Sequence, residues 1–183
     1  AVVGWLDRPG SVVRLSLSAG PDAGGMVRSV ADDALVTRTG IERSLRRLLA
    51  GRAAEELILG EPSSGAGGPE ESDLAKATLL ATRAVTSLGL GGTQPLVWRG
   101  EPTAASMSQM LALQPAIAKE VHGMLAEAHQ RAREMLEEHR PALVRVARAL
   151  LERETVEGEE LAALITPPDV LDDGPPKAKD APR

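Results

Sequence analysis

The chain has 183 residues, a formal net charge of −5 at pH 7, two Trp, and no Cys, Phe or Tyr. The absence of cysteine excludes disulfides and thiolate metal sites, and the negative charge disfavours a general nucleic-acid-binding surface. The length suffices for one domain with a core, with or without a tail. Without Phe or Tyr, the small and aliphatic residues must fill that core, which favours closely packed helices.

The N-terminal residues predict the end of a helix followed by one β-hairpin. The helix covers Ala1 to Leu6 and ends at Asp7-Arg8-Pro9-Gly10. Apolar and polar residues alternate from Val12 to Leu17, which is typical of a strand. A turn rich in Gly and Pro spans Gly20 to Gly25, and Met26 to Val30 is the expected partner strand. We expect no further β-structure.

Two helices are predicted next, because apolar residues recur at helical spacing. Thr39 and Glu42 have the spacing of a capping box at the start of the first helix. Gly60 is a suitable C-terminal stop for this helix. Ser72 can cap the second helix, which is expected to end at Gly89.

The second half of the chain predicts an irregular segment followed by three more helices. Gly91 to Met110 is expected to be irregular, because Pro95 and Pro102 interrupt any regular element. A long helix follows, with Pro115 in its first turn, and it breaks at His139-Arg140-Pro141. Another helix and a short final one complete the predicted set.

These elements predict a mainly α fold with one short β-hairpin near the N-terminus. The domain is expected to cover residues 1–165. Residues 166–183 are rich in Pro, Lys and Asp and have little apolar content, so we predict a disordered tail there. No apolar run reaches the length of about 20 residues that a membrane-spanning helix needs.

The residues alone reveal no complete catalytic constellation. His122 and His129 are seven positions apart, whereas a zinc-binding pair on one helix usually has a spacing of about three or four. We interpret both as solvated histidines on a helix; the third histidine, His139, lies at the predicted helix break. Nucleophile-elbow, phosphate-loop, dinucleotide and calcium-loop motifs do not occur in the sequence.

Three carboxylates have simple structural explanations that stay open at this point. Asp73 would lie in the first turn of a helix, where the helix dipole stabilises a negative charge. Glu55 and Glu56 fit an ordinary exposed helix surface, and Glu56 is also placed to pair with Arg52 one turn earlier.

Two runs together resemble the second half of the peptidase domain of FtsH-type, ATP-dependent zinc metalloproteases. The first run is LAGRAAEEL, from Leu49 to Leu57, closed by Gly60-Glu61. The second run is Ser63 to Ala66, followed by Ser72 to Thr78. Weaker similarities occur in the same order along the chain, so that the resemblance covers residues 1–165: at 83–90, 95–98, 128–140 and 150–161.

The resemblance implies that Asp73 is a zinc ligand, the third of its site. It implies a supporting role beside the metal helix for Glu55 and Glu56, for which a hydrogen bond to a ligand is one route. In the family the other two ligands and the catalytic glutamate belong to a His-Glu-x-x-His helix, a motif that this sequence lacks. Ala1-Val2-Val3 is similar to the residues that directly follow that motif. We therefore expect no catalytic residue in this chain and no activity of the fragment alone.

For the intact parent, the resemblance implies a zinc-bound water that attacks the peptide carbonyl of an unfolded or membrane protein. ATP would be bound only by an AAA+ ATPase module of the same parent, outside this chain, which would feed polypeptide substrates to the peptidase. The subunits would assemble as hexamers. We expect a cytoplasmic location, at the cytoplasmic face of a membrane if parts outside this chain anchor the protein.

Two other interpretations stay open. The first is a non-catalytic helical interaction or assembly module, which lost the zinc helix by descent and binds partners through the long helix around Val121 to Leu136. The second is an unrelated helical regulatory domain, which would be favoured if Asp73 lay in solvent far from Ala1. An upstream His-Glu-x-x-His segment would support the protease, and a start codon would support the assembly module.

Overall fold

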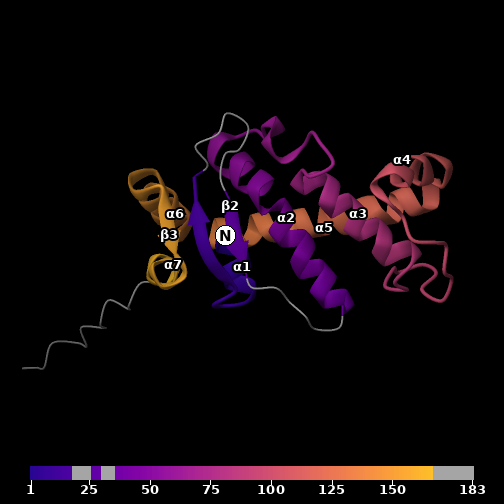
Figure 1. Ribbon diagram of the computed structural model, residues 1–183, viewed down its shortest axis with the longest axis horizontal. Helices are drawn as coiled ribbons and strands as arrows, with labels where there is room; N and C mark the ends of the chain where they lie inside the picture. Colours follow the sequence, from indigo (N-terminus) through magenta and orange to yellow (C-terminus); the bar gives the residue numbers. More distant parts are fainter. Residues whose placement is uncertain (18–25, 30–35, 167–183) are drawn as a thin grey trace, which may run out of the picture.

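The computed structural model describes residues 1–17, 26–29 and 36–166 of the chain (Figure 1). It is mainly helical and contains a small antiparallel sheet, which confirms the predicted fold class. Its elements in chain order are α1 (Val2–Asp7), β1 (Val12–Ser16), β2 (Met26–Ser29), α2 (Arg38–Leu59), the 3-10 helix η1 (Ser64–Ala66), α3 (Asp73–Thr86), α4 (Ala104–Leu113), α5 (Pro115–Glu138), α6 (Arg140–Arg153), β3 (Thr155–Glu157) and α7 (Gly158–Ile165).

The sheet has the order β2-β1-β3, with both pairs antiparallel. The predicted hairpin is therefore present, and β3 is an additional strand that the sequence did not predict. Leu15 in β1 lies opposite Val27 on one side and Val156 on the other. Glu154, with a φ of 59°, ends α6 and turns the chain into β3. A strand of three residues between two helices is too short to show an alternating pattern.

Several predicted segments fall outside the described residues. They are the turn from Gly20 to Gly25, the last residue of the second predicted strand, and the tail beyond Thr166. Among the described residues, no helix combines the length and the apolar composition required to cross a bilayer.

For the first two long helices, two predicted boundaries are confirmed and two are wrong, one of which is the end of the second helix, at Thr86 and not at Gly89. Gly60 ends α2 in the left-handed conformation, with a φ of 86°, and Ser72 caps α3 through its side chain. The capping box predicted at Thr39 does not form, because the helix begins earlier. Thr37 is the N-cap residue, and its hydroxyl oxygen accepts a hydrogen bond of 3.1 Å from the Gly40 amide.

Helix α4 corrects the prediction that residues 91–110 are irregular. Thr103 and Ser106 form a capping box, in which each side chain bonds to the backbone of the other residue. Pro102 lies just before this cap and is fully buried. The proline therefore precedes the helix and does not interrupt it, a position that proline tolerates.

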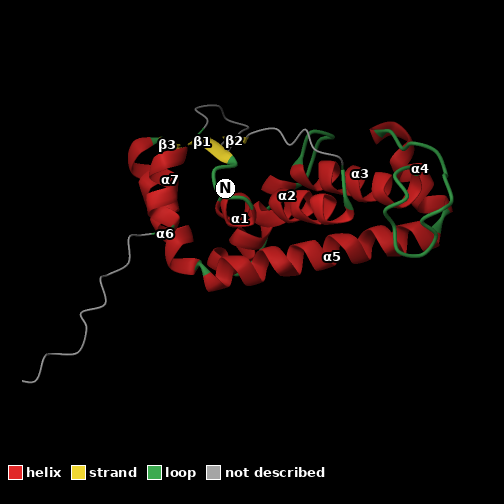
Figure 2. Cartoon of the chain, turned by 90° about the horizontal axis from the view of Figure 1, so that it is seen from below, coloured by secondary structure: helices red, strands yellow, loops and turns green. Residues whose placement is uncertain are grey.

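The frame of the molecule is the pair α2 and α5, which make the most extensive helix–helix contact. Helix α5 runs along most of the molecule, with α2 and α3 beside it (Figures 1 and 2). Ala53 of α2 and Ala132 of α5 are fully buried. Small side chains at the contact let the two backbones approach closely, which compensates for the absence of Phe and Tyr.

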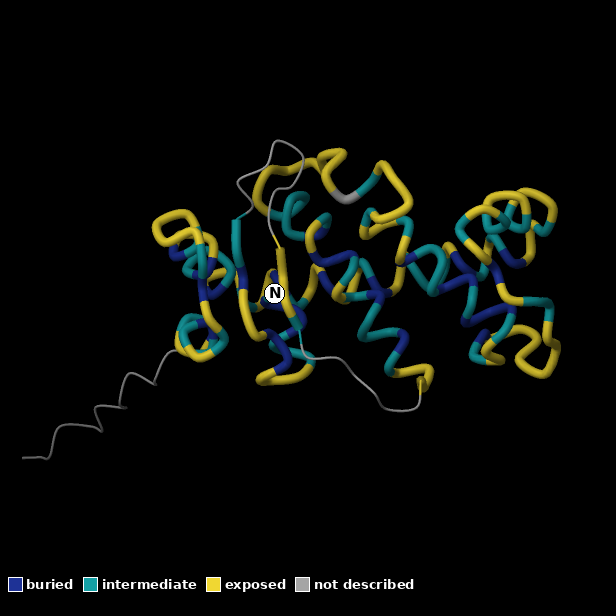
Figure 3. The backbone as a smooth tube through the Cα atoms, in the orientation of Figure 1, coloured by how far each residue is buried: buried dark blue, intermediate teal, exposed yellow. Residues whose placement is uncertain are grey.

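Buried side chains form two clusters, and the dark segments in Figure 3 follow both. The first cluster joins α1, the sheet, α6 and α7 to the adjoining parts of α2 and α5. The second joins α3 to the remaining parts of the same two helices. Val121 and Leu136, which bound the surface expected for a helical assembly module, are each only 2% exposed. That apolar face of α5 is therefore used inside the chain.

Substituting Leu45 with Ala tests the second cluster, since Leu45 is completely buried in α2. We expect a loss of about 2–5 kcal/mol in the free energy of unfolding, because the substitution removes apolar contacts and leaves a cavity. Urea unfolding followed by circular dichroism measures this change. Leu59→Ala is the matched control on the same helix: Leu59 is 67% exposed, and its change should stay within about 0.5 kcal/mol. Equal effects of the two substitutions would contradict the described core.

Candidate functional site

Asp73 is the first residue of α3, and its side chain is exposed at the N-terminal end of that helix. The preceding Ser72 fixes the helix start, because its hydroxyl oxygen accepts a hydrogen bond of 3.3 Å from the Ala75 amide. A carboxylate here also interacts favourably with the helix dipole. Asp73 thus lies in the first turn of a helix, as its structural explanation from the sequence expected. In this position its carboxylate stays accessible to solvent.

The N-terminal end of α1 lies within electrostatic reach of Asp73. Burial of the Ala1 amino group, together with the positive charge of Arg47, lowers the pKa of that group to about 6. The charge of Asp73 acts on the same amino group in the opposite direction. Residues 72 positions apart in the sequence are therefore close in space. The regulatory-domain interpretation expected Asp73 in solvent and far from Ala1. Asp73 is exposed, but its charge acts on Ala1, so only the first of these two conditions is met.

Helix α1 is fixed firmly against α2. Arg46 of α2 donates two hydrogen bonds to Asp7, of 2.7 and 3.3 Å, and both side chains are less than one-fifth exposed. The Ser11 hydroxyl donates a buried hydrogen bond of 2.8 Å to the Gly4 carbonyl. Val3, also in α1, is fully buried. These contacts set the direction in which α1 presents Ala1 to α3.

Glu55 holds the segment that leads from α2 to α3. Its Oε2 accepts hydrogen bonds from the Ser63 amide, at 2.8 Å, and from the Ser63 hydroxyl, at 2.9 Å. The Ser63 hydroxyl oxygen in turn accepts one from the Gly65 amide, at 3.0 Å. Glu55 therefore fixes the start of η1, which precedes Asp73 in the chain.

Glu56 points to a different neighbour and joins α2 to α5. Its Oε1 accepts a hydrogen bond of 3.1 Å from Arg52, as the spacing in sequence suggested. Its Oε2 lies 3.2 Å from Nε2 of His129, whose side chain is 24% exposed. The interpretation of His129 as a solvated histidine is thus wrong, whereas His122 is exposed. Sequence spacing gave no signal for this contact, because the two residues lie on helices far apart in the chain.

The described residues do not form a zinc site by themselves. Within residues 1–17, 26–29 and 36–166, no three His, Cys, Asp or Glu side chains come together as metal ligands. A zinc site needs at least three protein ligands, and Asp73 supplies one oxygen donor. Glu55 and Glu56 are each occupied by other partners.

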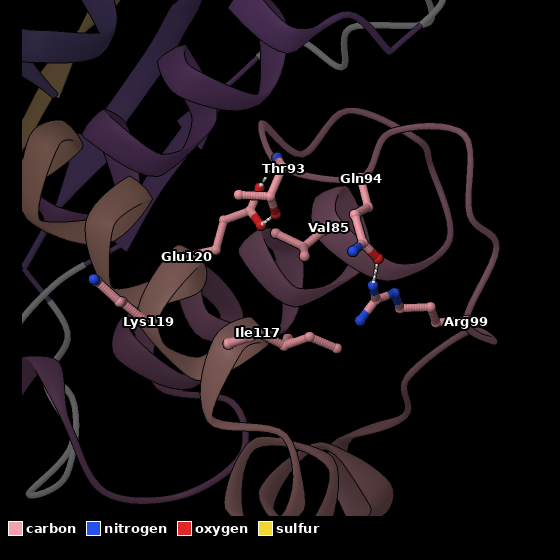
Figure 4. Close-up of a pocket in the computed structure, with 8 residues that line it drawn as sticks. Val85, Thr93, Gln94, Arg99, Ile117, Lys119 and Glu120 are labelled. Carbon is pink, nitrogen blue, oxygen red and sulfur yellow. Dashed lines mark hydrogen bonds between the residues drawn. The ribbon is translucent and has the colours of Figure 1, made fainter.

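A second polar cluster lines a cavity of about 390 Å³ between the loop after α3 and the start of α5 (Figure 4). Glu120 of α5 accepts hydrogen bonds from the amides of Gly92 and Thr93 and from the Thr93 hydroxyl. Partial burial acts to raise the pKa of Glu120, but these hydrogen bonds and the charge of Arg38 hold it below its usual value. Glu120 thereby fastens the loop to α5.

Comparison with known proteins gives consistent matches over nearly the whole chain. The family model of peptidase family M41 matches residues 1–164. ATP-dependent zinc metalloprotease FtsH 2 of Sphaerobacter thermophilus is 38% identical over 161 residues, which cover 86% of this chain and 24% of that protein. ATP-dependent zinc metalloprotease FtsH 1 of Conexibacter woesei is 32% identical over 179 residues, 90% of this chain and 26% of that protein. The chain thus spans about a quarter of the length of these relatives.

Glu55→Ala tests whether the hydrogen bonds from Ser63 to Glu55 fix the segment before α3. We expect the free energy of unfolding to fall by about 1 kcal/mol, because two hydrogen bonds to a charged acceptor are lost at a partly exposed site. Hydrogen exchange of the Ser63 amide should become faster. Glu61→Ala, an exposed carboxylate in the same segment, is the control and should leave that amide unchanged. Unchanged exchange in the Glu55 variant would refute the role of Glu55.

Glu120→Gln tests the carboxylate that fastens the loop after α3. Because the folded-state pKa of Glu120 is lowered, its ionised form stabilises the fold above the unfolded-state pKa, and this contribution is lost as the pH falls through the folded-state pKa. At neutral pH the variant should therefore be less stable than the unsubstituted chain, and the difference should shrink in acid. Urea unfolding at several pH values measures it. A stability difference that grows in acid would contradict the lowered pKa of Glu120.

Proposed function

Because this chain belongs to peptidase family M41, we propose that it forms the C-terminal, mainly helical part of an FtsH-type zinc metallopeptidase domain. The domain would cover residues 1–165, and residues 166–183 would be a tail. One observation supports the assignment of the site: the charge of Asp73 acts on the amino group of Ala1, the residue that is similar to the first one after the His-Glu-x-x-His helix.

The geometry of α1 explains why this contact matters. Ala1 is the N-cap residue of α1, and its carbonyl accepts a hydrogen bond of 2.9 Å from the Trp5 amide. A helix that continued upstream of Ala1 would place its next turn within about 5 Å along the axis. Side chains of that turn would thus lie near the exposed carboxylate of Asp73, which supports its assignment as the third zinc ligand.

The chain alone is expected to be inactive under this proposal. A catalytic zinc site requires three protein ligands and an open position for water. This sequence supplies one of those ligands, and it lacks the motif that carries the other two and the catalytic glutamate. Zinc in a complete site would supply the activation of water for peptide hydrolysis.

Glu55 and Glu56 would support the site without touching the metal. Glu55 fixes the segment ahead of α3 through Ser63, which helps to position Asp73. Glu56 connects α2 to α5 through His129, and α2 is the helix on which both α1 and α3 pack. Each carboxylate therefore acts on the helices that bring Asp73 and Ala1 together.

The proposal for the parent protein draws on the relatives. They are ATP-dependent zinc metalloproteases by name, and this chain spans only about a quarter of their length. We therefore place ATP binding in an AAA+ module outside this chain, which would deliver polypeptide substrates to the peptidase of a hexamer. A cytoplasmic location, at a membrane face if other segments anchor the parent, is part of the same proposal.

Substituting Asp73 tests the ligand assignment in a chain extended upstream by a His-Glu-Ala-Gly-His segment. We expect this extended chain to bind one zinc ion, and Asp73→Ala to weaken the affinity at least about tenfold, or about 1.4 kcal/mol. Competition with a chromophoric chelator measures the affinity.

The matched control is Glu71→Ala, which removes an exposed carboxylate two positions earlier and should leave zinc binding unchanged. Equal zinc affinities of the extended chain and its Asp73→Ala variant would rule out Asp73 as a ligand. The metal-free extended chain and its metal-free Asp73→Ala variant should unfold at the same temperature. A lower unfolding temperature of the variant would reveal a folding defect.

A further inference from the structure

The cavity of about 390 Å³ between the loop after α3 and the start of α5 contains none of the residues assigned to the zinc site. We call it the loop cavity. Its inner wall is apolar, because Val85 of α3 is 7% exposed and Ile117 of α5 is 2% exposed, and Ala116 belongs to the same lining. A concave site of this size, with an apolar wall and a few polar groups, is typical of small-molecule binding.

Arg99 directs its guanidinium group into the loop cavity (Figure 4). This group donates a hydrogen bond to Oε1 of Gln94, which orients the guanidinium and leaves its charge intact, because the amide is neutral. In the described part of the chain, no ion pair involves Arg99. A guanidinium carries five N–H donors in a planar arrangement that matches the two oxygens of a carboxylate. Arg99 therefore keeps donors for an anionic ligand.

Glu120, the carboxylate of the lining, is engaged with the loop and not with Arg99. Its two oxygens accept hydrogen bonds from the Gly92 and Thr93 amides and from the Thr93 hydroxyl. Lys119 also belongs to the lining, and its ammonium end lies on the side of the cavity away from Arg99 (Figure 4). The lining thus carries one more positive than negative charge, which favours an anionic ligand.

The loop that carries Arg99 is fixed at both ends. The Arg99 amide donates a hydrogen bond of 2.8 Å to the Thr86 carbonyl at the end of α3. At the other end, Gly91 is buried, and a Cβ at this position would lie 2.8 Å from Oε1 of Glu120. The glycine thus lets the loop approach α5. Because the loop cavity is already formed, ligand binding requires little ordering of the loop, which lowers its entropic cost.

We propose that the loop cavity binds a monocarboxylate with a short, branched apolar group. The carboxylate pairs with the guanidinium of Arg99, and the apolar group lies against Val85 and Ile117. A free small carboxylic acid and the C-terminal leucine of a polypeptide share this chemistry. The site goes beyond the proposed peptidase function and does not depend on zinc.

Titration of the isotope-labelled, 183-residue chain with isocaproate tests this site. Isocaproate has the branched carbon skeleton of leucine without its amino group. Two-dimensional NMR should show shifts of the amide signals of Thr93, Gln94, Arg99 and Lys119. We expect a dissociation constant on the order of 1 mM, which is typical of so small a ligand. Isocaproamide has the same shape without the charge, and it should bind at least about tenfold more weakly.

Two variants alter the loop cavity from its opposite walls. Arg99→Met removes the charge but keeps an unbranched side chain, and it should weaken isocaproate binding at least about tenfold. Ala116→Phe places a ring in the cavity from the side of α5 and should also prevent binding. Each variant has a matched control at an exposed position outside the lining, Arg133→Met in α5 and Ala112→Phe in α4. Both controls should bind isocaproate like the unsubstituted chain.

N-acetyl-alanyl-leucine distinguishes the two sources of the carboxylate. Tighter binding of this peptide than of isocaproate would assign the loop cavity to the C-terminus of a polypeptide, whereas equal or weaker binding would assign it to a free acid. Both results support the proposed site.

Three results would overturn the proposal. They are the absence of amide shifts up to about 20 mM isocaproate, equal affinities for isocaproate and isocaproamide, and normal binding of isocaproate by the Arg99→Met variant. Because zinc affinity is measured separately, none of them affects the test of Asp73.

Discussion

The close contact between α2 and α5 is the constraint on which the rest of the molecule depends. Fully buried alanines on both helices let the backbones approach, so a chain without Phe or Tyr still packs a core. Both buried clusters draw residues from these two helices. The sheet end and the α3 end are consequently built on the same two helices, and a larger side chain at Ala53 or Ala132 would disturb the first cluster, to which both alanines belong.

The candidate site is a product of that frame. Helices α1 and α3 both pack on α2, which brings Ala1 close to Asp73 although many residues separate them in the chain. The salt bridge between Arg46 and Asp7 fixes the far end of α1, and the bonds from Ser63 to Glu55 fix the approach to α3. Of the residues in the two family runs, Glu55 and Ser63 thus hold the segment that leads to α3.

The sequence predicted some of the features that depend on local chemistry and missed others, namely the cap at Thr37 and the start of α4 at Thr103. Gly60 and Ser72 end and begin helices because of backbone conformation and side-chain capping, and both positions were predictable from residue type. The third strand depends on pairing between Val156 and Leu15, which are far apart in the chain. Likewise, the contact between Glu56 and His129 exists only once two helices have packed. Long-range contacts of this kind leave no periodic signal, and neither of these two contacts was predicted.

The buried hydroxyl groups of α3 bear on how firmly that helix is held along its axis. Thr82 and Thr86 are fully buried, and each hydroxyl donates to the carbonyl four residues earlier in the same helix, at 2.8 Å. These bonds satisfy the polar groups without tying α3 to α2 or α5. Resistance to sliding must then come from the shapes of small side chains and from the two ends of the helix. The position of Asp73 then depends also on the far end of α3. There the Thr86 carbonyl accepts a hydrogen bond from the Arg99 amide.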